Sequence, residues 1–525
     1  MVPRLLALLL LVSMAIADER ADFLKASEEL SKVYFDQIPV DQRDRLFEAM
    51  GRYDHPDIVK PIAEIASRFG AFLGLIEAQK AEAERKLQPL IGATSLSDLD
   101  VGLRNSYTRK VQEAEEQERF GRASEGLLVR ALGASKDERT VIAAGKEFGK
   151  HPAWRVRRIL AAASAQWHKG LGSEKATRSV FETLKRLRAD EEPRVRIAVA
   201  QSLAAFHRKE ALDLLEQLYS DADWRVRAAV TESLKTVGSG ECVTLLVERM
   251  KLETGRLQDD IAQALSAVTG EKWQYAEEWD GWWTGVGKVL TADRTAGAAA
   301  AAAAQRENSK GGDRFYGIPT NSDHICYIID RSGSMEKEVE QFKQVTITGR
   351  KETDTPVGGK TRIEVAKNEL KRAIGNLSSG KRFSIIFFNH GVQRWRSEPV
   401  KATPDNKKEA LADIDRITAV GATYSLGALR EAFSMAGAIQ AAGKTRRDNA
   451  SVDTIFFLSD GGPTDNKIEE AQPMDPEPIL ESVRQWNRDA KIVIHTIAVD
   501  TEEVGTYFLK QLAAQNGGMF VERRK

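Results

Sequence analysis

The chain has 525 residues, and its 77 Lys and Arg side chains are balanced by 77 Asp and Glu side chains, so its formal net charge is zero. A chain of this length is expected to form about two to four domains, each able to bury its own core. The balanced charge gives no reason to expect a nucleic-acid partner or a basic membrane-binding face.

The N-terminal residues are typical of a secretory signal peptide. Arg4 precedes an apolar core, Leu5–Ile16, and the small residues Ala15 and Ala17 lie just before Asp18. We therefore expect residues 1–17 to be cleaved off after Ala17 and the mature protein to be secreted or periplasmic. The apolar core is shorter than the roughly 20 residues that a membrane span needs, and no other segment is predicted to cross a membrane.

The cysteines and histidines predict neither a disulfide framework nor a zinc site. Cys242 lies in a predicted helix and Cys326 in a predicted strand of another domain, so we expect both to be small buried residues. The seven histidines are scattered, and no Cys/His cluster has zinc-ligand spacing.

Residues 18–133 are predicted to be helical, but their pattern does not indicate a function. Apolar residues recur there at helical spacing: Ile62, Ile65, Phe69, Phe72, Leu73 and Ile76. We expect the acidic residues of the next segment, Tyr107–Phe120, to form the solvated face of a long helix. A partner-binding helix is the alternative, which the charge pattern alone does not favour.

Residues 134–290 contain a repeated pattern. Three predicted helices begin with WRVR, RVR and WRVR, centred on Val156, Val195 and Val226, which are 39 and 31 residues apart. Acidic residues or Pro precede the second and third of these helices, as at helix N-termini. Paired helices at such a period are typical of an α-solenoid. The pattern resembles HEAT repeats, although the 31-residue interval is shorter than usual.

Two features of the repeats have alternative interpretations. We expect the arginines to pair with the preceding acidic residues and to pack over the next repeat; a basic stripe for an anionic ligand is the alternative. The close tryptophans Trp273, Trp279, Trp282 and Trp283 are expected to cover the end of the helices, the alternative being a sugar-binding platform. The solenoid is interpreted as a docking surface or spacer.

Residues 291–312 are predicted to be a linker. They contain seven alanines, Ala298–Ala304, followed by polar residues and glycines. Polyalanine with nothing to pack against is a semi-rigid spacer at most. We therefore expect a variable orientation of the following domain, residues 313–525, relative to the repeats.

A candidate metal site begins at the end of an apolar run. Ile325–Ile329 is predicted to be a buried strand of a parallel sheet, and it leads to a loop that carries Asp330, Ser332 and Ser334. These hard oxygen ligands suit Mg²⁺, Mn²⁺ or Ca²⁺ and suit zinc or copper poorly. Taken alone, the spacing is also that of an ordinary polar turn.

Two later segments add oxygen ligands of the same kind. Thr423 lies in a loop before a predicted helix, Leu426–Ile439, and Asp460 follows a second apolar strand, Thr454–Leu458. Together with the Asp-x-Ser-x-Ser loop, these residues resemble the von Willebrand factor A family and its metal-ion-dependent adhesion site. The resemblance covers residues 323–525.

The resemblance implies how such a site works. Ser332 and Ser334 bind the metal directly, Thr423 binds it when a ligand is engaged, and Asp330 and Asp460 act largely through water. Mg²⁺, the expected ion, prefers six ligands and retains waters, so one position stays exchangeable. An Asp or Glu carboxylate of a partner protein would fill that position. A metal that only ties loops together is the alternative.

The order of the elements predicts the fold of the C-terminal part. Predicted strands and helices alternate, which requires a doubly wound, mostly parallel sheet covered by helices on both faces. The ligand loops are expected beyond the carboxyl ends of the central strands, at a topological switch point. Residues 336–361 depart from the family pattern because they separate the Ser-x-Ser loop from the first helix. We expect their polar tail, residues 349–360, to form a loop near the metal that selects partners or shields the site.

The sequence therefore predicts an exported, non-enzymatic binding or adhesion protein in which HEAT-like repeats are the scaffold of a metal-dependent domain. A metal-assisted hydrolase is one alternative, but no general base presents itself, and His324 and His390 are the nearest imidazoles in sequence. An assembly factor for another protein complex is the other alternative, although the chain has no phosphate-binding glycine loop and the expected export argues against a cytosolic ATPase partner.

Overall fold

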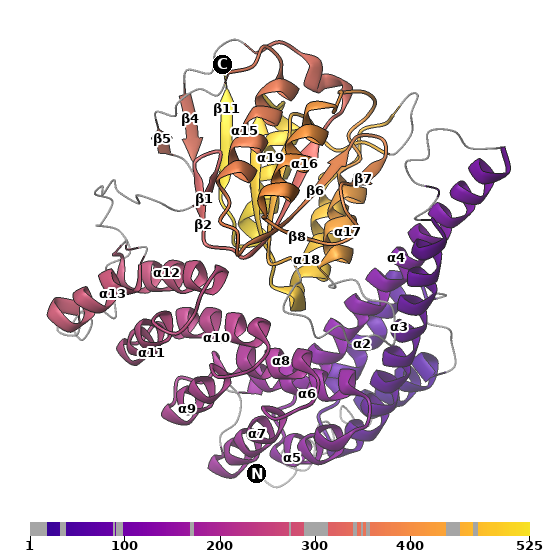
Figure 1. The fold of residues 1–525 in the computed structure, drawn as a ribbon. Helices are drawn as coiled ribbons and strands as arrows, with labels where there is room; N and C mark the ends of the chain where they lie inside the picture. The colour runs from indigo at the N-terminus through magenta and orange to yellow at the C-terminus, as the bar shows by residue number, and fades with distance from the viewer. Residues whose placement is uncertain are drawn as a thin grey trace, which may run out of the picture.

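The computed structural model describes residues 18–31, 38–87, 90, 98–167, 173–271, 273, 275–287, 313–339, 344–347, 350–352, 358–436, 452–465 and 471–524. The helices within residues 18–287, here called the helical array, precede an α/β domain within residues 313–524, here called the C-terminal domain (Figure 1). The expected signal peptide, residues 1–17, and the expected linker, residues 291–312, lie outside the described residues. None of the described helices is long and apolar enough to cross a membrane.

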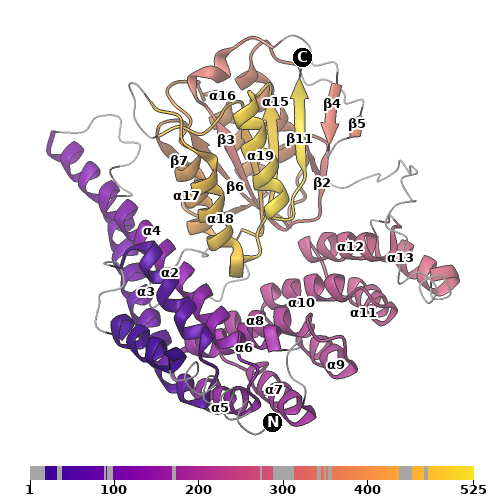
Figure 2. The ribbon, with the colours of Figure 1, turned by 180° about the vertical axis from the view of Figure 1, so that it is seen from behind.

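The helical array is built mainly from α-helices that follow one another along the chain. They are α2 (Val40–Arg52), α3 (Val59–Leu87), α4 (Asp98–Gly133), α5 (Glu138–Glu147), α6 (Trp154–Trp167), α7 (Glu174–Leu187), α8 (Pro193–Leu203), α9 (Lys209–Leu218), α10 (Trp224–Val237), α11 (Gly240–Met250), α12 (Arg256–Thr269) and α13 (Ala276–Trp282). Helices α4, α6, α8, α10 and α12 pack against one another in turn, and α5, α7 and α9 form a second row beside them (Figures 1 and 2).

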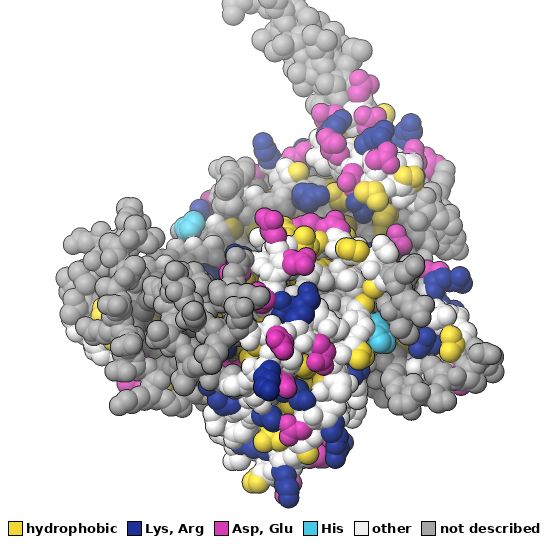
Figure 3. Space-filling view, turned by 90° about the horizontal axis from the view of Figure 1, so that it is seen from above, with side chains coloured by type: hydrophobic (Ala, Val, Ile, Leu, Met, Phe, Trp, Pro, Cys, Tyr) yellow, Lys and Arg dark blue, Asp and Glu magenta, His cyan; other side chains and the backbone are white. Residues whose placement is uncertain are grey.

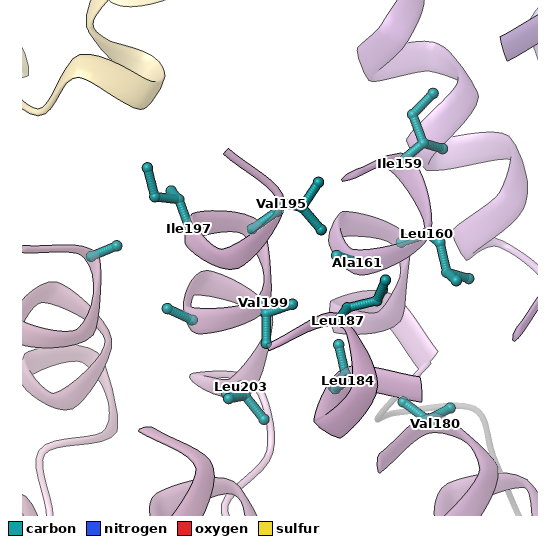
Figure 4. Close-up of a cluster of buried hydrophobic side chains, with 14 of the residues drawn as sticks. Ile159, Leu160, Ala161, Val180, Leu184, Leu187, Val195, Ile197, Val199 and Leu203 are labelled. Carbon is teal, nitrogen blue, oxygen red and sulfur yellow. The ribbon is translucent and has the colours of Figure 1, made fainter. Parts of the chain in front are cut away.

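The repeated valines lie in the core of this array. Val156, Val195 and Val226 are all buried, and each lies in the first turn of its helix. Side chains of α6, α7 and α8 converge between the helices, where Leu160, Leu184 and others pack together (Figure 4). This stacking of helix pairs is the α-solenoid that the repeat predicts.

The second arginine of each repeat connects that repeat to the next one. Arg196 donates from Nε and Nη2 to the two carboxylate oxygens of Asp221, at 2.7 and 2.8 Å, and from Nη1 to the carbonyl of Asp190 at 2.7 Å. Arg157 and Arg227 make the same bidentate pairs with acidic residues that follow them in the chain. The arginines are therefore structural. The second arginines pair with the following acids, whereas the first arginines Arg194 and Arg225 pair with the preceding acids Glu192 and Asp223, as expected.

The tryptophans at the end of the array pack inward. Trp279 and Trp283 are buried in the same core as the repeats, and Trp273 and Trp282 pack against that core. The indole N–H of Trp279 donates to the carbonyl of Trp273 at 2.9 Å. This packing is that of a cap on the last helices, not of an exposed aromatic platform.

Helices α3 and α4 lie side by side and are here called the arm. Lys80 on α3 is buried against α4, where its Nζ lies 3.0 Å from Glu118 Oε2 and 3.5 Å from Glu115 Oε1. Arg122 binds the other oxygen of Glu118 at 2.6 Å. The expectation of a solvated acidic face is therefore wrong for Glu115 and Glu118, which lie inside an ion-pair cluster.

The described strands of the C-terminal domain are mainly parallel. They are β1 (Asp313–Phe315), β2 (Ile318–Thr320), β3 (His324–Asp330), β4 (Gln344–Ile347), β5 (Arg350–Glu352), β6 (Arg382–Phe388), β7 (Val392–Arg394), β8 (Val400–Lys401), β9 (Thr454–Ser459), β10 (Val493–Val499) and β11 (Phe520–Arg524). The main sheet has the order β5-β4-β11-β10-β9-β3-β6-β7, and β8 also pairs with β6. Strands β11, β10, β9, β3 and β6 are parallel, and the outer strands are antiparallel.

Helices cover both faces of this sheet, as the alternating pattern predicts. On one face, α15 (Arg362–Asn376) and α16 (Pro404–Asp415) pack on alternate residues of β3, such as Tyr327. On the other face, α17 (Ser425–Met435), α18 (Pro476–Ala490) and α19 (Glu503–Gln515) pack on the residues between them, such as Cys326. Cys242 and Cys326 are both buried and not bonded to each other. Because β3 leads to β6 on one side and β9 lies on its other side, the switch point lies between β3 and β9.

The segment between the Ser-x-Ser loop and α15 extends the sheet. Its strands β4 and β5 form an antiparallel hairpin, and β4 pairs with the edge strand β11. At the base of the segment, Glu338 forms a bridge with Thr361, and Val339 N–H donates to the carbonyl of Lys360 at 2.9 Å. The expectation of a loop near the metal is therefore corrected for Arg350–Glu352, which is an edge strand.

The helical array contacts the C-terminal domain at two places. In the arm, Glu115 lies 2.6 Å from Nε of Arg430 on α17, and Glu125 lies 3.2 Å from Nη1 of Arg488 on α18. At the far end of the array, Asp259 on α12 accepts from the backbone and side-chain N–H groups of Asn321, at 2.9 and 2.8 Å. The orientation of the C-terminal domain, expected to be variable, is thus set by side-chain contacts on both sides.

Candidate metal centre

The five predicted ligands come from three loops at one edge of the sheet. Asp330 ends β3, Ser332 is the residue before a short 3₁₀ turn, Gly333–Glu336, and Ser334 lies within that turn. Asp460 follows β9, the parallel neighbour of β3. Thr423 lies two residues before α17 begins. Seen from above, the described side chains on the surface of the molecule are an intermixture of apolar, acidic and basic types (Figure 3).

A continuous chain of hydrogen bonds joins four of these residues. Asp330 accepts from the backbone N–H of Ser332 at 2.7 Å and from the hydroxyl of Ser459 at 2.6 Å. Ser334 donates its hydroxyl proton to Oδ1 of Asp460 at 2.8 Å, so its oxygen accepts from Ser332 Oγ, 3.0 Å away. Carboxylates from β3 and β9 are thereby held on the two sides of the serine pair.

Thr423 is attached to the same site through its backbone. Its N–H donates to the hydroxyl of Thr464 at 2.9 Å, and its carbonyl accepts from Thr464 N–H at 2.9 Å. Gly421, with φ of +79°, accepts from Gly333 N–H at 2.8 Å and so fixes this loop to the Ser-x-Ser loop. All five predicted ligands therefore lie on loops that are bonded to one another.

The loop after Asp460 is tightly packed against α19. A Cβ added to Gly505 would lie 2.8 Å from the carbonyl carbon of Gly461 and 3.0 Å from the N of Gly462. Real Cβ atoms essentially never approach backbone atoms so closely, so Gly505 is needed for this approach. The position of Asp460 thus depends on a residue 45 positions along the chain.

A cation that sequence reasoning missed lies at this site. Arg362, the first residue of α15, donates from Nη1 to Oδ2 of Asp460 and from Nη2 to Oδ2 of Asp500, both at 2.6 Å. Asp500 follows β10 and has a positive φ of 52°. The signal available in the sequence was the first helix of the family pattern. In this chain that helix begins at Arg362, whose N–H donates to the carbonyl of Lys337 just after the Ser-x-Ser loop.

Electrostatics distinguish Asp330 from an ordinary surface carboxylate. Burial, followed by the negative charge of Asp460, raises the pKa of Asp330 to about 7, although Ser459 and Ser332 donate hydrogen bonds to it. Two neighbouring buried carboxylates disfavour a second negative charge, and a bound cation would remove this repulsion.

The donor set fits a hard divalent cation. Two carboxylates and three hydroxyls are all oxygen ligands, the kind that Mg²⁺ and Ca²⁺ take. In the part of the chain that the structure describes, no group of three or more His, Cys, Asp and Glu side chains is placed to hold a metal ion. An ion at this edge of the sheet would therefore need Ser332, Ser334 and Thr423 as well as the two carboxylates.

Comparison with protein families finds both parts of the predicted architecture. A model of HEAT repeats matches residues 180–266. A model of the von Willebrand factor type A domain matches residues 353–521, which include Thr423 and Asp460 but begin after Ser334. The chain thus contains HEAT repeats followed by a von Willebrand factor A domain, with the helical and doubly wound folds described above.

Curated relatives match the chain over part of its length. The inter-alpha-trypsin inhibitor heavy chain H1 of Mesocricetus auratus is 23% identical over 197 residues, which are 38% of this chain and 18% of that protein. The heavy chain H2 of Mus musculus is 29% identical over 150 residues, which are 29% of this chain and 15% of that protein. The chain thus spans less than a fifth of the length of these relatives.

Among solved structures, a von Willebrand factor type A protein from Catenulispora acidiphila matches with a TM-score of 0.27 and 18% identity. The match covers 39% of this chain and 40% of that chain.

Proposed function

We propose that the von Willebrand factor A domain of this chain captures an Asp or Glu carboxylate of a partner protein at a divalent metal ion, with the HEAT repeats as its scaffold. The proposed protein ligands of the ion are Asp330, Ser332, Ser334, Thr423 and Asp460. Mg²⁺ is the proposed ion, and Mn²⁺ or Ca²⁺ would serve the same role. When bound, such an ion supplies an exchangeable coordination position for an incoming carboxylate. No bond is made or broken, so the proposed role is binding or adhesion and not catalysis.

The observation that carries this proposal is the convergence of hydroxyls and carboxylates from three loops. Ser459 and the N–H of Ser332 hold Asp330 in one orientation, and Asp460 orients the hydroxyl of Ser334. These contacts prearrange oxygen atoms that would otherwise have to be ordered at the moment of binding. The relatives that share this domain, named as inhibitor heavy chains, support a role in protein binding.

We also propose that this binding takes place outside the cytoplasm. The proposal rests on the signal-peptide pattern of residues 1–17. N-terminal sequencing of the protein from the exported fraction should give Asp18 as its first residue. A full-length chain that stays in the cytoplasm would contradict it.

The first test is calorimetric titration of Mg²⁺, Mn²⁺ and Ca²⁺ into the full chain. We expect saturable binding of one ion, which is lost when Asp330 and Asp460 are both replaced by Ala. Asp405→Ala removes an exposed carboxylate on α16 and is the matched control, which should bind as the wild type does. Equal binding by the wild type and the double variant would refute the proposed site.

The second test concerns the partner. With metal present, the protein should bind immobilised peptides that display an Asp or Glu side chain and should not bind matched Asn or Gln peptides. A chelator should abolish the binding. Capture that is indifferent to the chelator would contradict a metal-bridged contact.

The position of His390 bears on the hydrolase alternative. His390 lies against Gly421 in the loop of Thr423, and burial followed by the charge of Arg331 lowers its pKa, so its imidazole is neutral near pH 7. A screen of ester and phosphoester substrates would detect metal-dependent turnover, and its loss in His390→Gln would favour this alternative. The assembly-factor alternative predicts a stable complex that co-purifies whether or not metal is present.

A further inference from the structure

Arg362 is brought to the metal centre by the closure of a long segment. Residues 338–361 leave and re-enter the domain at the bridge between Glu338 and Thr361, and Arg362 N–H then donates to the carbonyl of Lys337 at 3.1 Å. Thr361 caps α15 by accepting from the N–H of Glu364. The backbone of Arg362 is therefore bonded to Lys337, three residues after Ser334, although Arg362 itself lies 28 residues after Ser334 in sequence.

The side chain of Arg362 is a buried cation in direct contact with a proposed ligand. It is 7% exposed, and its two terminal nitrogens form ion pairs of 2.6 Å with Asp460 and Asp500. Burial opposes the charge of the guanidinium, but the two carboxylates outweigh burial and raise its pKa. Arg362 is therefore a permanent positive charge of this site.

Counting charges shows what Arg362 does to the site. Asp330, Asp460 and Asp500 carry three negative charges when ionised, and Arg362 reduces the sum of these four groups to minus two. One oxygen of Asp460 holds Arg362, and the other holds the hydroxyl of Ser334. A divalent ion and Arg362 would thus share the same carboxylate, and two positive charges at one carboxylate repel each other in a buried site.

We propose that Arg362 is a built-in competitor of the metal ion, which lowers the cation affinity of the site and holds its carboxylates together when no ion is bound. This inference rests on the proposed metal-dependent function, because it concerns the regulation of the same site. Its consequence is that the site binds metal only where the ion is abundant or where a partner's carboxylate adds a further negative charge.

A different role for Arg362 makes the opposite prediction. If Arg362 only positions Asp460 for the metal, its removal leaves the carboxylate misplaced and weakens metal binding. If it competes with the metal, its removal strengthens metal binding. The direction of the change in affinity therefore separates the two roles.

The test is titration of Mn²⁺ and Mg²⁺ into the full chain by calorimetry, with variants that change charge at and away from the site. We expect Arg362→Gln to bind the metal ion about tenfold more tightly than the wild type does, or more, which corresponds to a gain of about 1.4 kcal/mol in binding free energy. Arg362→Lys should show no such increase in metal affinity. Asp500→Asn keeps Arg362 but removes a negative charge, so we expect weaker binding. Lys371→Gln removes a positive charge from the surface of the same helix, where Lys371 pairs with Asp415, and should bind as the wild type does.

A second readout uses thermal unfolding in the presence of a chelator. Without metal, Arg362→Gln should unfold at a lower temperature than the wild type, because three carboxylates are left without their cation. Added Mn²⁺ should raise the midpoint of Arg362→Gln by more than it raises that of the wild type. Equal midpoints in chelator would overturn the inference.

The outcomes separate this inference from the proposed function. Weaker or unchanged metal binding by Arg362→Gln, with normal binding by the wild type, overturns the competitor role and leaves the metal site standing. Absence of metal binding in both the wild type and Arg362→Gln overturns the inference and the proposed function together. Binding by Arg362→Gln but not by the wild type supports the inference in its strongest form.

Discussion

Glu118 in the arm offers a quantitative test of the buried ion-pair cluster. The side chain is 4% exposed, and its oxygens accept from Lys80 at 3.0 Å and from Arg122 at 2.8 Å. Burial alone would raise the pKa of Glu118, but the charges and hydrogen bonds of Arg122 and Lys80 lower it from 4.5 to about 2. A difference of about 2.5 in pKa corresponds to about 3 kcal/mol, at about 1.4 kcal/mol per pKa unit.

The sign of this contribution follows from the direction of the pKa change. Because the folded-state pKa of Glu118 is lower than the unfolded-state value, the stabilisation is present in full above pH 4.5 and is lost as the pH falls toward 2. Glu118→Gln should therefore lower the free energy of unfolding by about 3 kcal/mol at pH 7. The difference between wild type and variant should shrink below about pH 4.5 and approach zero near pH 2.

The assay is urea unfolding followed by helical circular dichroism at a series of pH values. Glu113→Gln is the matched control, since Glu113 lies on the exposed side of the same helix, where it forms an ion pair with the exposed Arg109 at 3.4 Å. The control should change the unfolding midpoint little at any pH. A Glu118→Gln effect that equals the control, or that stays constant from pH 7 to pH 3, would refute the assignment of Glu118 as a buried charged partner of Lys80.

Three further substitutions test other parts of the structure. Trp279→Ala should destabilise the end of the helical array by about 3 to 5 kcal/mol, because the side chain is fully buried there, and limited proteolysis should then cut first near α13. Arg196→Met should cost about 3 kcal/mol, because it leaves the carboxylate of Asp221, whose side chain is 10% exposed, without its ion-pair partner; unchanged urea unfolding would contradict the connection between repeats. Gly505→Ala should displace the backbone of Gly461 and weaken metal binding in calorimetry, whereas wild-type affinity would show that the loop tolerates the shift.

The clustering of the five proposed metal ligands was predictable because it depends on strand ends. Asp330 and Asp460 each follow an apolar strand, and the carboxyl ends of parallel strands meet at one edge of a sheet. The doubly wound fold followed from the same alternation of strands and helices, and the solenoid followed from Val156, Val195 and Val226. In each case a short local pattern carries the information.

Long-range pairing was not predictable in the same way. Glu115 and Glu118 lie in a charged stretch whose local pattern predicts a solvent-exposed helix face. No local feature of the sequence indicates that they form ion pairs with Lys80 and Arg430. The contact between Arg362 and Asp460 was not predictable, because residues 338–361 separate Arg362 from the Ser-x-Ser loop in sequence. The hairpin of that segment is recognised only through its pairing with β11. The composition of residues 291–312 predicts freedom of orientation, but the side chains that set the orientation lie far from that segment.

The two attachments of the C-terminal domain have a mechanical consequence. A partner bound at the proposed metal centre would pull on β3 at Asp330. Asn321 lies three residues before the start of β3 and is bound by Asp259 of α12. The same pull reaches α17, which carries Arg430 to the arm. The load is thus divided between two ends of the array, and β3 transmits its share as shear across the parallel ladders to β6 and β9, where the backbone hydrogen bonds must fail together instead of one by one.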